Sequence, residues 1–395
     1  MSNVPIIFIL AGIAAYTVLA GADFGAGIWT LIPGTDREQV RHAMGPVWEA
    51  NHVWLIFILV VAWTCYPVAY GSIVSTLSVP LLIAAIGIIF RGTAYALRSQ
   101  ISAGARLVEN LFALSSVLTP FALGTVIGAI ATGRVPVGNA AGNLVTSWLN
   151  PVSILTGVLG VAFSAYLAAV YLAADARRIS ERLVVPALRI RALLSGAVAG
   201  ALAIAGLLVV RSSAAPLWHG LTSGAGLVMV CVCAAAGVAT MALVWRSVFG
   251  LARASAALAV AAVIGGWAAA QRPYLLPGLT VAQAAAGRAT LVAIIVSVIV
   301  GGAVLVPSLI LLYSLFLRGK LDVGTGEEAG APRPPSARPA APPAVRTPAV
   351  AFAAVTLLAG VVLLVFTDPP WTHGLGAVCL IACAVRIFTL TATPD

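Results

Sequence analysis

The sequence predicts an all-α integral membrane protein, a polytopic helix bundle with a nine-span core, two further C-terminal spans and its N-terminus outside. Hydrophobic residues make up 61% of the 395 residues and charged residues only 9%, whereas soluble chains carry about 25% charged residues. The mean hydropathy is +1.06. Long apolar segments recur along the chain, and a helix of about 20 residues is enough to cross the hydrocarbon of a bilayer. Because these segments are uniformly apolar rather than alternating, helices are favoured over a β-barrel.

The first nine apolar segments precede a clear break in composition. The chain begins without a basic stretch or a small-residue cleavage site, so we expect its first segment to be a retained helix rather than a signal peptide. The nine predicted spans cover residues 5–31, 50–70, 77–97, 110–131, 150–173, 192–211, 223–245, 252–270 and 289–317.

The break in composition separates the nine-span core, residues 1–320, from a C-terminal extension. Most of the connecting stretch reads TGEEAGAPRPPSARPAAPPAVRTP, which is rich in Pro and Ala and contains no apolar run. Such a stretch cannot bury a core, so we interpret residues 321–348 as a disordered or extended cytoplasmic linker. Two apolar segments, about 349–366 and 374–391, then form a two-span extension over residues 349–395.

The distribution of basic residues predicts how the bundle sits in the membrane. Sixteen of the 22 basic residues fall in the loops that follow the odd-numbered spans of the core, counting the linker with the last of them. Lys and Arg gather in cytoplasmic loops, so the N-terminus is predicted outside and these loops inside. The same rule explains the net charge of +10 without nucleic acid as a partner, since no basic and aromatic cluster is present.

The cysteines give no sign of a metal site. All five lie in apolar segments, none forms a C-x-x-C pair, and no histidine or carboxylate completes a ligand set. We interpret them as buried packing residues. They are Cys65, Cys231, Cys233, Cys379 and Cys383.

An acidic residue, Asp23, lies inside the first span in the stretch GADFGAGIW. Ionisable residues within spans are costly and usually mark a pairing site or an ion path. The Gly21-x-x-x-Gly25 spacing lets another helix approach closely. The alternative is that the span ends early and Asp23 is interfacial, but the apolar run continues past it. We therefore favour proton relay or pairing, at the cytoplasmic end of the span.

A second polar group opens the second span in the stretch VWEANHVWLIF. Glu49 and His52 are three residues apart and share one helix face, and Asn51 and Trp54 share a neighbouring face. Taken alone, this spacing is consistent with part of a metal site, with a proton relay or with a polar pair whose hydrogen bonds are satisfied. Four histidines in the chain are too few for a metal site or for bis-histidine haem ligation within the spans. Relay and polar pairing both remain.

Arg91, in the stretch FRGTAYALR, lies well inside the third span. It needs a carboxylate, an acidic headgroup or a partner subunit with which to pair. Alternatively its long stem reaches the interface, as Arg98 at the membrane edge suggests.

Together these stretches resemble subunit II of the cytochrome bd quinol oxidases over about residues 1–320. Further matching stretches, in the family's order, are LGTVIGAIATGRVP, LNPVSILTGVLG, QRPYLLPGLT and LVPSLILLY. The most specific element is the W-[DE]-x-N-x-V-W pattern from Trp48 to Trp54. The nine spans and the outside N-terminus also agree with the family.

The resemblance implies a haem-free subunit of a bacterial cytoplasmic membrane complex that oxidises quinol and reduces dioxygen to water. Haems b and d, or b only, and the quinol-oxidising site are expected on a homologous subunit I. Small single-span accessory subunits, lipid and, in some members, a bound quinone are further expected partners. No cofactor is expected on this chain alone, no catalytic residue within it and no metal.

The resemblance also implies roles for individual residues. Asp23 and Glu49 match acids associated with proton delivery from the cytoplasm, and we place His52 and Asn51 with them on the candidate path. Trp54, with Trp48, is implied at an oxygen path or a helix interface. Arg91 matches a position for a quinone or lipid headgroup. On this basis Asp23→Asn and Glu49→Gln are expected to lower quinol-dependent oxygen consumption and leave the haem content intact.

The sequence departs from the family at two points, and two competing functions remain. Glu49 stands where many members have Asp, which keeps the acid on a longer arm. Residues 321–395 have no counterpart in the usual subunit. The competing functions are a proton-coupled secondary transporter using the same acids and a purely structural scaffold. Transporters often contain internal repeats, and we find no clear repeat here.

Overall fold

The computed structural model describes residues 1–32, 37–97, 105–178 and 185–317, together with isolated positions between 352 and 382. For residues 37–50 and several positions near other helix ends it describes the backbone alone. The chain divides into two compact units, Met1–Ser314 and Leu315–Asp395. The isolated described positions of the second unit, among them Phe352 and Val378, are helical. The linker and nearly all of the extension lie outside the described residues, so both remain predictions.

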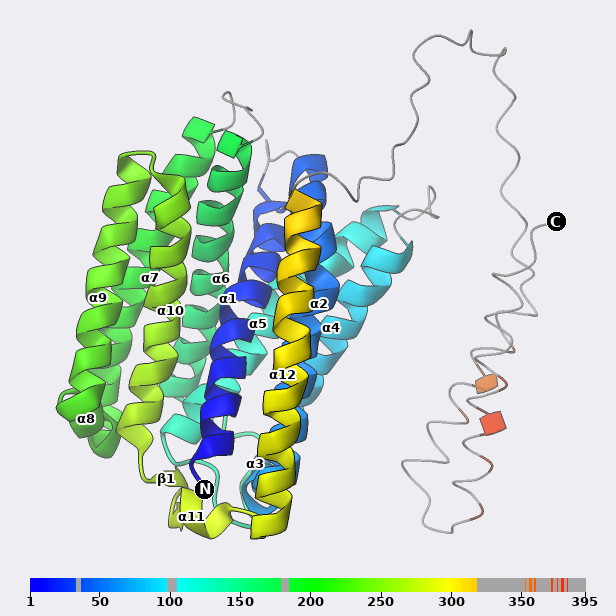
Figure 1. The fold of residues 1–395 in the computed structure, drawn as a ribbon, viewed down its shortest axis with the longest axis vertical. Helices are drawn as coiled ribbons and strands as arrows, with labels where there is room; N and C mark the ends of the chain where they lie inside the picture. The colour runs from blue at the N-terminus through cyan, green and yellow to red at the C-terminus, as the bar shows by residue number, and fades with distance from the viewer. Residues whose placement is uncertain are drawn as a thin grey trace, which may run out of the picture. The chain divides into compact units, whose positions relative to one another are not determined.

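The first unit is a bundle of long helices that run side by side (Figure 1). Short helices and one two-stranded hairpin join them. In chain order the elements are α1 (Val4–Trp29), α2 (Arg37–Cys65), α3 (Pro67–Thr76), α4 (Ser78–Leu97), α5 (Ala105–Ala131), α6 (Pro151–Arg178), α7 (Val185–Ser213), α8 (Ala215–Leu221), α9 (Gly224–Trp245), α10 (Phe249–Gln271), β1 (Tyr274–Leu276), β2 (Leu279–Thr280), α11 (Val281–Ala284) and α12 (Arg288–Leu317).

The all-α membrane fold predicted from composition is confirmed. Seven helices of the described residues are long and apolar enough to cross a membrane, and an eighth span results if α3 and α4 are counted as one. Residues Asn51–Cys65, which form the part of α2 after the polar segment, are a shorter apolar stretch of helix. Eight of the nine predicted core spans each coincide with one long helix of Figure 1, whereas the second, residues 50–70, takes in the end of α2 and the start of α3. The number of helices that cross the bilayer remains a prediction.

Two boundaries differ from the prediction. The polar segment before residue 50 was expected to be a loop, but α2 begins at Arg37. Its Arg, Glu, Gln, Ala and Met residues are good helix formers, which explains the longer helix. The second predicted span is interrupted after Cys65, because the chain forms a separate helix, α3, whose axis bends by 83° from that of α4. Pro67 fits the first turn of α3, where its missing N–H is not needed.

The connections at the N-terminal end of the bundle are ordered. Strands β1 and β2 form an antiparallel hairpin, and Gly278 adopts a φ of 75° in its turn. Thr280 caps α11 through a capping box with Gln283. The backbone N–H of Ala286 donates to the carbonyl of Cys65 at 2.8 Å, which ties the segment after α11 to the end of α2. In Figure 1 the N-terminus lies at this end, beside α3, β1 and α11.

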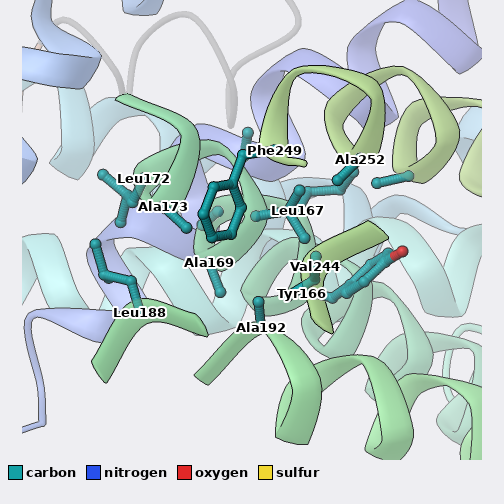
Figure 2. Packing of buried hydrophobic residues seen from close by; sticks show 14 of the residues in the cluster. Tyr166, Leu167, Ala169, Leu172, Ala173, Leu188, Ala192, Val244, Phe249 and Ala252 are labelled. Carbon is teal, nitrogen blue, oxygen red and sulfur yellow. The ribbon is translucent and has the colours of Figure 1, made fainter. Parts of the chain in front are cut away.

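Helix α6 supplies the centre of the largest apolar cluster. Residues Leu167 to Val170 of α6 have no exposed surface and pack with residues of α1, α7, α9 and α10 (Figure 2). Two of these four residues are alanines, and small side chains let helix backbones approach closely within a membrane. This packing places α1 against α6 and fixes the face of α1 that carries Asp23.

Candidate functional site

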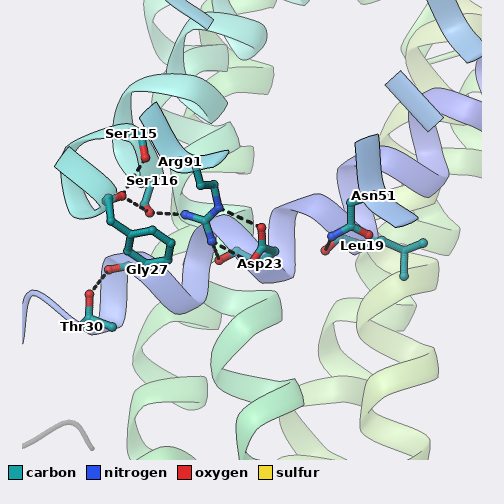
Figure 3. Close-up of polar contacts among 9 residues, drawn as sticks. Leu19, Asp23, Gly27, Thr30, Asn51, Arg91, Ser115 and Ser116 are labelled. Atoms are coloured by element: carbon teal, nitrogen blue, oxygen red, sulfur yellow. Dashed lines mark hydrogen bonds and ion pairs between the residues drawn. The ribbon is translucent and has the colours of Figure 1, made fainter. Parts of the chain in front are cut away.

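A buried ion pair joins α1 to α4. The Nε and Nη2 atoms of Arg91 donate to the two carboxylate oxygens of Asp23 at 2.9 and 2.7 Å. Nη2 also donates to the backbone carbonyl of Asp23 at 2.6 Å (Figure 3). Asp23 is 1% exposed and Arg91 is 0% exposed. A two-pronged arginine–carboxylate contact of this kind is among the strongest polar contacts in proteins.

The ion pair provides the pairing that the sequence allowed for both residues. Asp23 is buried inside the bundle, and Arg91 does not extend its stem to the surface. Of the partners considered for Arg91, the structure provides the carboxylate. Its guanidinium is enclosed and engaged within this chain, and the assignment of Arg91 to a quinone or lipid headgroup stays a prediction.

Helix α5 supplies the third part of the site. Nη1 of Arg91 donates to the hydroxyl of Ser116 at 2.6 Å, and that hydroxyl donates to the carbonyl of Phe112 at 2.7 Å. The guanidinium carbon also lies 4.2 Å from the ring centroid of Phe112 and 5.0 Å from that of Phe24. Aromatic faces attract cations, most strongly where water is excluded. Arg91 therefore holds α1, α4 and α5 together.

The glycines of the GADFGAG motif make room for these contacts on two faces of α1. A Cβ at Gly27 would lie 2.0 Å from the Ser116 hydroxyl and 3.1 Å from Nη1 of Arg91. On the other face, a Cβ at Gly25 would lie 1.8 Å from the carbonyl oxygen of Ser164 in α6. The indole N–H of Trp29 donates to the Ala165 carbonyl at 2.8 Å, which extends this contact. The close helix approach predicted from the Gly21–Gly25 spacing is confirmed.

The candidate residues of α2 lie next to this site. Asn51 is fully buried, and its side-chain amide donates to the Leu19 carbonyl of α1 at 3.3 Å. His52 and Trp54 are half-buried. Trp54 packs against the cluster of Tyr16, Ala20 and Phe24, and its ring meets that of Phe57 edge to face at 6.3 Å. The side chains of Glu49 and Trp48 lie outside the described residues.

The chemistry available at this site is that of a fixed charge pair. Four of the five guanidinium N–H groups of Arg91 are accounted for by Asp23 and Ser116. No group of three or more His, Cys, Asp or Glu side chains gathers anywhere in the described part of the chain. The pair therefore suits a structural and electrostatic role better than a role in reaction chemistry.

Sequence reasoning identified Asp23, Arg91 and Asn51 but missed Ser116 and Phe112. Ser115 and Ser116 are adjacent hydroxyl residues inside an apolar stretch, LFALSSVLTP, and this was the available signal. Hydroxyl groups within spans often bond to neighbouring helices. Phe112 gave no signal, because an aromatic residue in a membrane helix is ordinary.

The chain is similar to known proteins over most of its core. Residues 1–316 match the family model of cytochrome bd terminal oxidase subunit II. A cytochrome bd ubiquinol oxidase subunit 2 of Bacillus subtilis is 28% identical over 161 residues, 38% of this chain and 47% of the relative. A cytochrome bd-I ubiquinol oxidase subunit 2 of Escherichia coli is 26% identical over 169 residues, 40% of this chain and 44% of the relative.

These alignments span less than half the length of both curated relatives. Among solved structures, a chain of the bd oxidase from Geobacillus thermodenitrificans matches with a TM-score of 0.64 and 24% identity. That match covers 80% of this chain and 98% of the other. It supports the same arrangement of helices.

Proposed function

Because the chain belongs to the cytochrome bd terminal oxidase subunit II family, we propose that it is the haem-free subunit of a quinol:oxygen oxidoreductase. The family match across residues 1–316 is the observation that carries this proposal. In this role the chain is a multi-pass protein of the bacterial cytoplasmic membrane and supports a homologous subunit I. The transporter alternative has no comparable support.

We propose that the haems of such a complex lie on the partner, because this chain has no pair of histidines within its core spans for bis-histidine ligation. Haem iron takes axial ligands such as His, Met or Cys. Of the four histidines, His42 lies in the polar segment before residue 50, and His219 and His373 lie toward the predicted outer side. His52 alone lies within a core span, which does not suit bis-histidine ligation. The quinol-oxidising site is likewise proposed for subunit I.

The geometry supports different roles in proton delivery for the candidate residues. The Asp23 carboxylate is engaged by Arg91, so we propose that it fixes α1 against α4 and α5. Glu49 and His52 on α2 would then carry protons from the cytoplasmic side, with Asn51 holding α2 against α1. Trp54 is proposed for an oxygen path or helix interface beside Phe24.

Glu49→Gln is expected to lower quinol-dependent oxygen consumption about ten-fold or more, because a proton-transfer group commonly contributes at least that much. The haem spectrum and the yield of complex are expected to stay unchanged. Oxygen uptake by membranes from cells that express the variant measures the effect, with membranes lacking the chain as the baseline.

The matched control is Glu49→Asp, which keeps an acid at the position and is expected to retain most of the activity. Full activity of Glu49→Gln would remove this residue from the proton path. Equal losses in Glu49→Gln and Glu49→Asp would assign Glu49 a packing role instead.

A further inference from the structure

A tyrosine in the middle of α1 carries a buried hydroxyl group that makes no contact of its own kind. Tyr16 lies twelve residues after Val4 and thirteen before Trp29, so it marks the midpoint of α1. Its side chain is only 7% exposed, and its hydroxyl makes no hydrogen bond within the described part of the chain. A buried polar group without a partner costs free energy, so packing alone does not account for a tyrosine here.

Asn51 of α2 presents a second buried polar atom of this kind. It is fully buried, and its side-chain N–H donates to the Leu19 carbonyl of α1 at 3.3 Å. Its side-chain oxygen has no hydrogen-bond partner among the described residues. Leu19 comes three residues after Tyr16, which corresponds to an axial rise of about 4.5 Å along α1.

The contact between α1 and α2 brings Tyr16 and Asn51 onto adjoining turns. Before Tyr16 in α1, a Cβ at Gly12 would lie 2.9 Å from a side-chain carbon of Ile58. After Tyr16, the contact continues through the hydrogen bond of Asn51. Between these two points, Trp54 packs against the cluster that contains Tyr16. Tyr16 therefore faces the stretch of α2 that begins at Asn51.

The two unpaired atoms complement each other chemically. A tyrosine hydroxyl both donates and accepts a hydrogen bond, whereas an amide oxygen only accepts. A buried water molecule typically makes about three hydrogen bonds to polar groups that lack other partners. The side chains that pack around Tyr16, among them Phe24 and Leu123, are apolar and offer no competing partner.

We propose that the Tyr16 hydroxyl and the Asn51 side-chain oxygen bind water and pass protons from the cytoplasmic end of α2 to the middle of the bundle. This inference rests on the proposed function, and it adds Tyr16 to the path proposed for Glu49 and His52. In the predicted orientation Asn51 lies on the cytoplasmic side of Tyr16. As the hydroxyl accepts a proton from one water it releases its own to the next, so one O–H bond forms while another breaks and Tyr16 is left unchanged.

Tyr16→Phe in the assembled complex tests the proposal, because it removes the hydroxyl and keeps the ring. We expect quinol-dependent oxygen consumption to fall about five-fold, the rate equivalent of one lost hydrogen bond. The solvent deuterium isotope effect on this rate is expected to rise, because proton transfer then limits turnover. Haem content and the thermal midpoint are expected to change little, since the hydroxyl has no partner in the described part of the chain.

Tyr166 of α6 supplies the matched control. It is 5% exposed and lies in the apolar cluster around α6 (Figure 2). Within the described residues, that cluster includes none from α2. Tyr166→Phe removes a buried hydroxyl in the same way, and we expect it to keep the rate and the isotope effect of the parent complex. Equal changes in the two variants would overturn the proposal.

Three further outcomes decide the matter. Full activity of Tyr16→Phe would overturn the proposal, and so would a lower rate with an unchanged isotope effect, which would assign Tyr16 a packing role. Loss of the assembled complex would also contradict it, because a hydroxyl that is required for folding must have a partner within the protein. If the parent complex itself shows no quinol-dependent oxygen consumption, the proposed function fails instead.

Discussion

Arg91→Met is expected to lower the free energy of unfolding of the bundle by about 3–5 kcal/mol, because it leaves a buried carboxylate without its cation. Asp23→Leu is expected to cost a similar amount, since the guanidinium is then buried unpaired. Both side chains are almost completely enclosed, and water cannot replace the lost partner. Thermal denaturation of the purified protein in detergent measures the change. Loss of assembled complex from the membrane is the expected cellular result.

The control for this prediction is a second ion pair, which is partly exposed. Arg253 and Asp175 are 33% and 29% exposed, so Asp175→Asn is expected to cost no more than about 1 kcal/mol. The double variant Asp23→Leu/Arg91→Met removes both buried charges and is expected to lose much less stability than the sum of the single variants. Additive losses would show that the two residues act independently.

Gly25→Ala is expected to destabilise the bundle by about 3 kcal/mol, at the upper end of the usual cost of overpacking. The new Cβ would lie 1.8 Å from the Ser164 carbonyl oxygen and 2.3 Å from its carbon. These are backbone atoms, which cannot turn aside as a flexible side chain can, so α1 and α6 must separate. The thermal midpoint in detergent measures the effect.

Gly237→Ala in α9 is the matched control, because nothing lies within 4 Å of a Cβ at that position. Alanine is the better helix former by about 1 kcal/mol, so this variant is expected to be neutral or slightly stabilising. A comparable loss of stability in both variants would mean that the close approach of α1 and α6 does not decide the effect at Gly25.

The helical membrane fold follows from the sequence because composition and segment length determine it. Within lipid, a chain must satisfy its own backbone hydrogen bonds, so long apolar segments become helices. The Gly21–Gly25 spacing also reported the close contact of α1 correctly, although it did not identify α6 as the partner. The predicted start of α2 was wrong. The polarity of the segment suggested a loop, but its good helix formers extend the helix back to Arg37.

The partner of Asp23 could not be obtained from the sequence. Arg91 is 68 residues away along the chain, and its position near Arg98 was equally consistent with reaching the interface. A pairing of this kind depends on how α1, α4 and α5 pack, and the apolar pattern does not encode that arrangement. The structure accordingly changes one expectation. Asp23→Asn is now expected to reduce assembled complex and haem content together, rather than activity alone.

Affinity purification of the tagged full chain from membranes tests the proposed function most directly. We expect a larger second subunit to accompany it, with b- or d-type haem absorbance in the reduced-minus-oxidised spectrum and quinol-dependent oxygen consumption. A stable protein that carries no haem, has no such partner and catalyses the uptake of a solute would contradict the assignment.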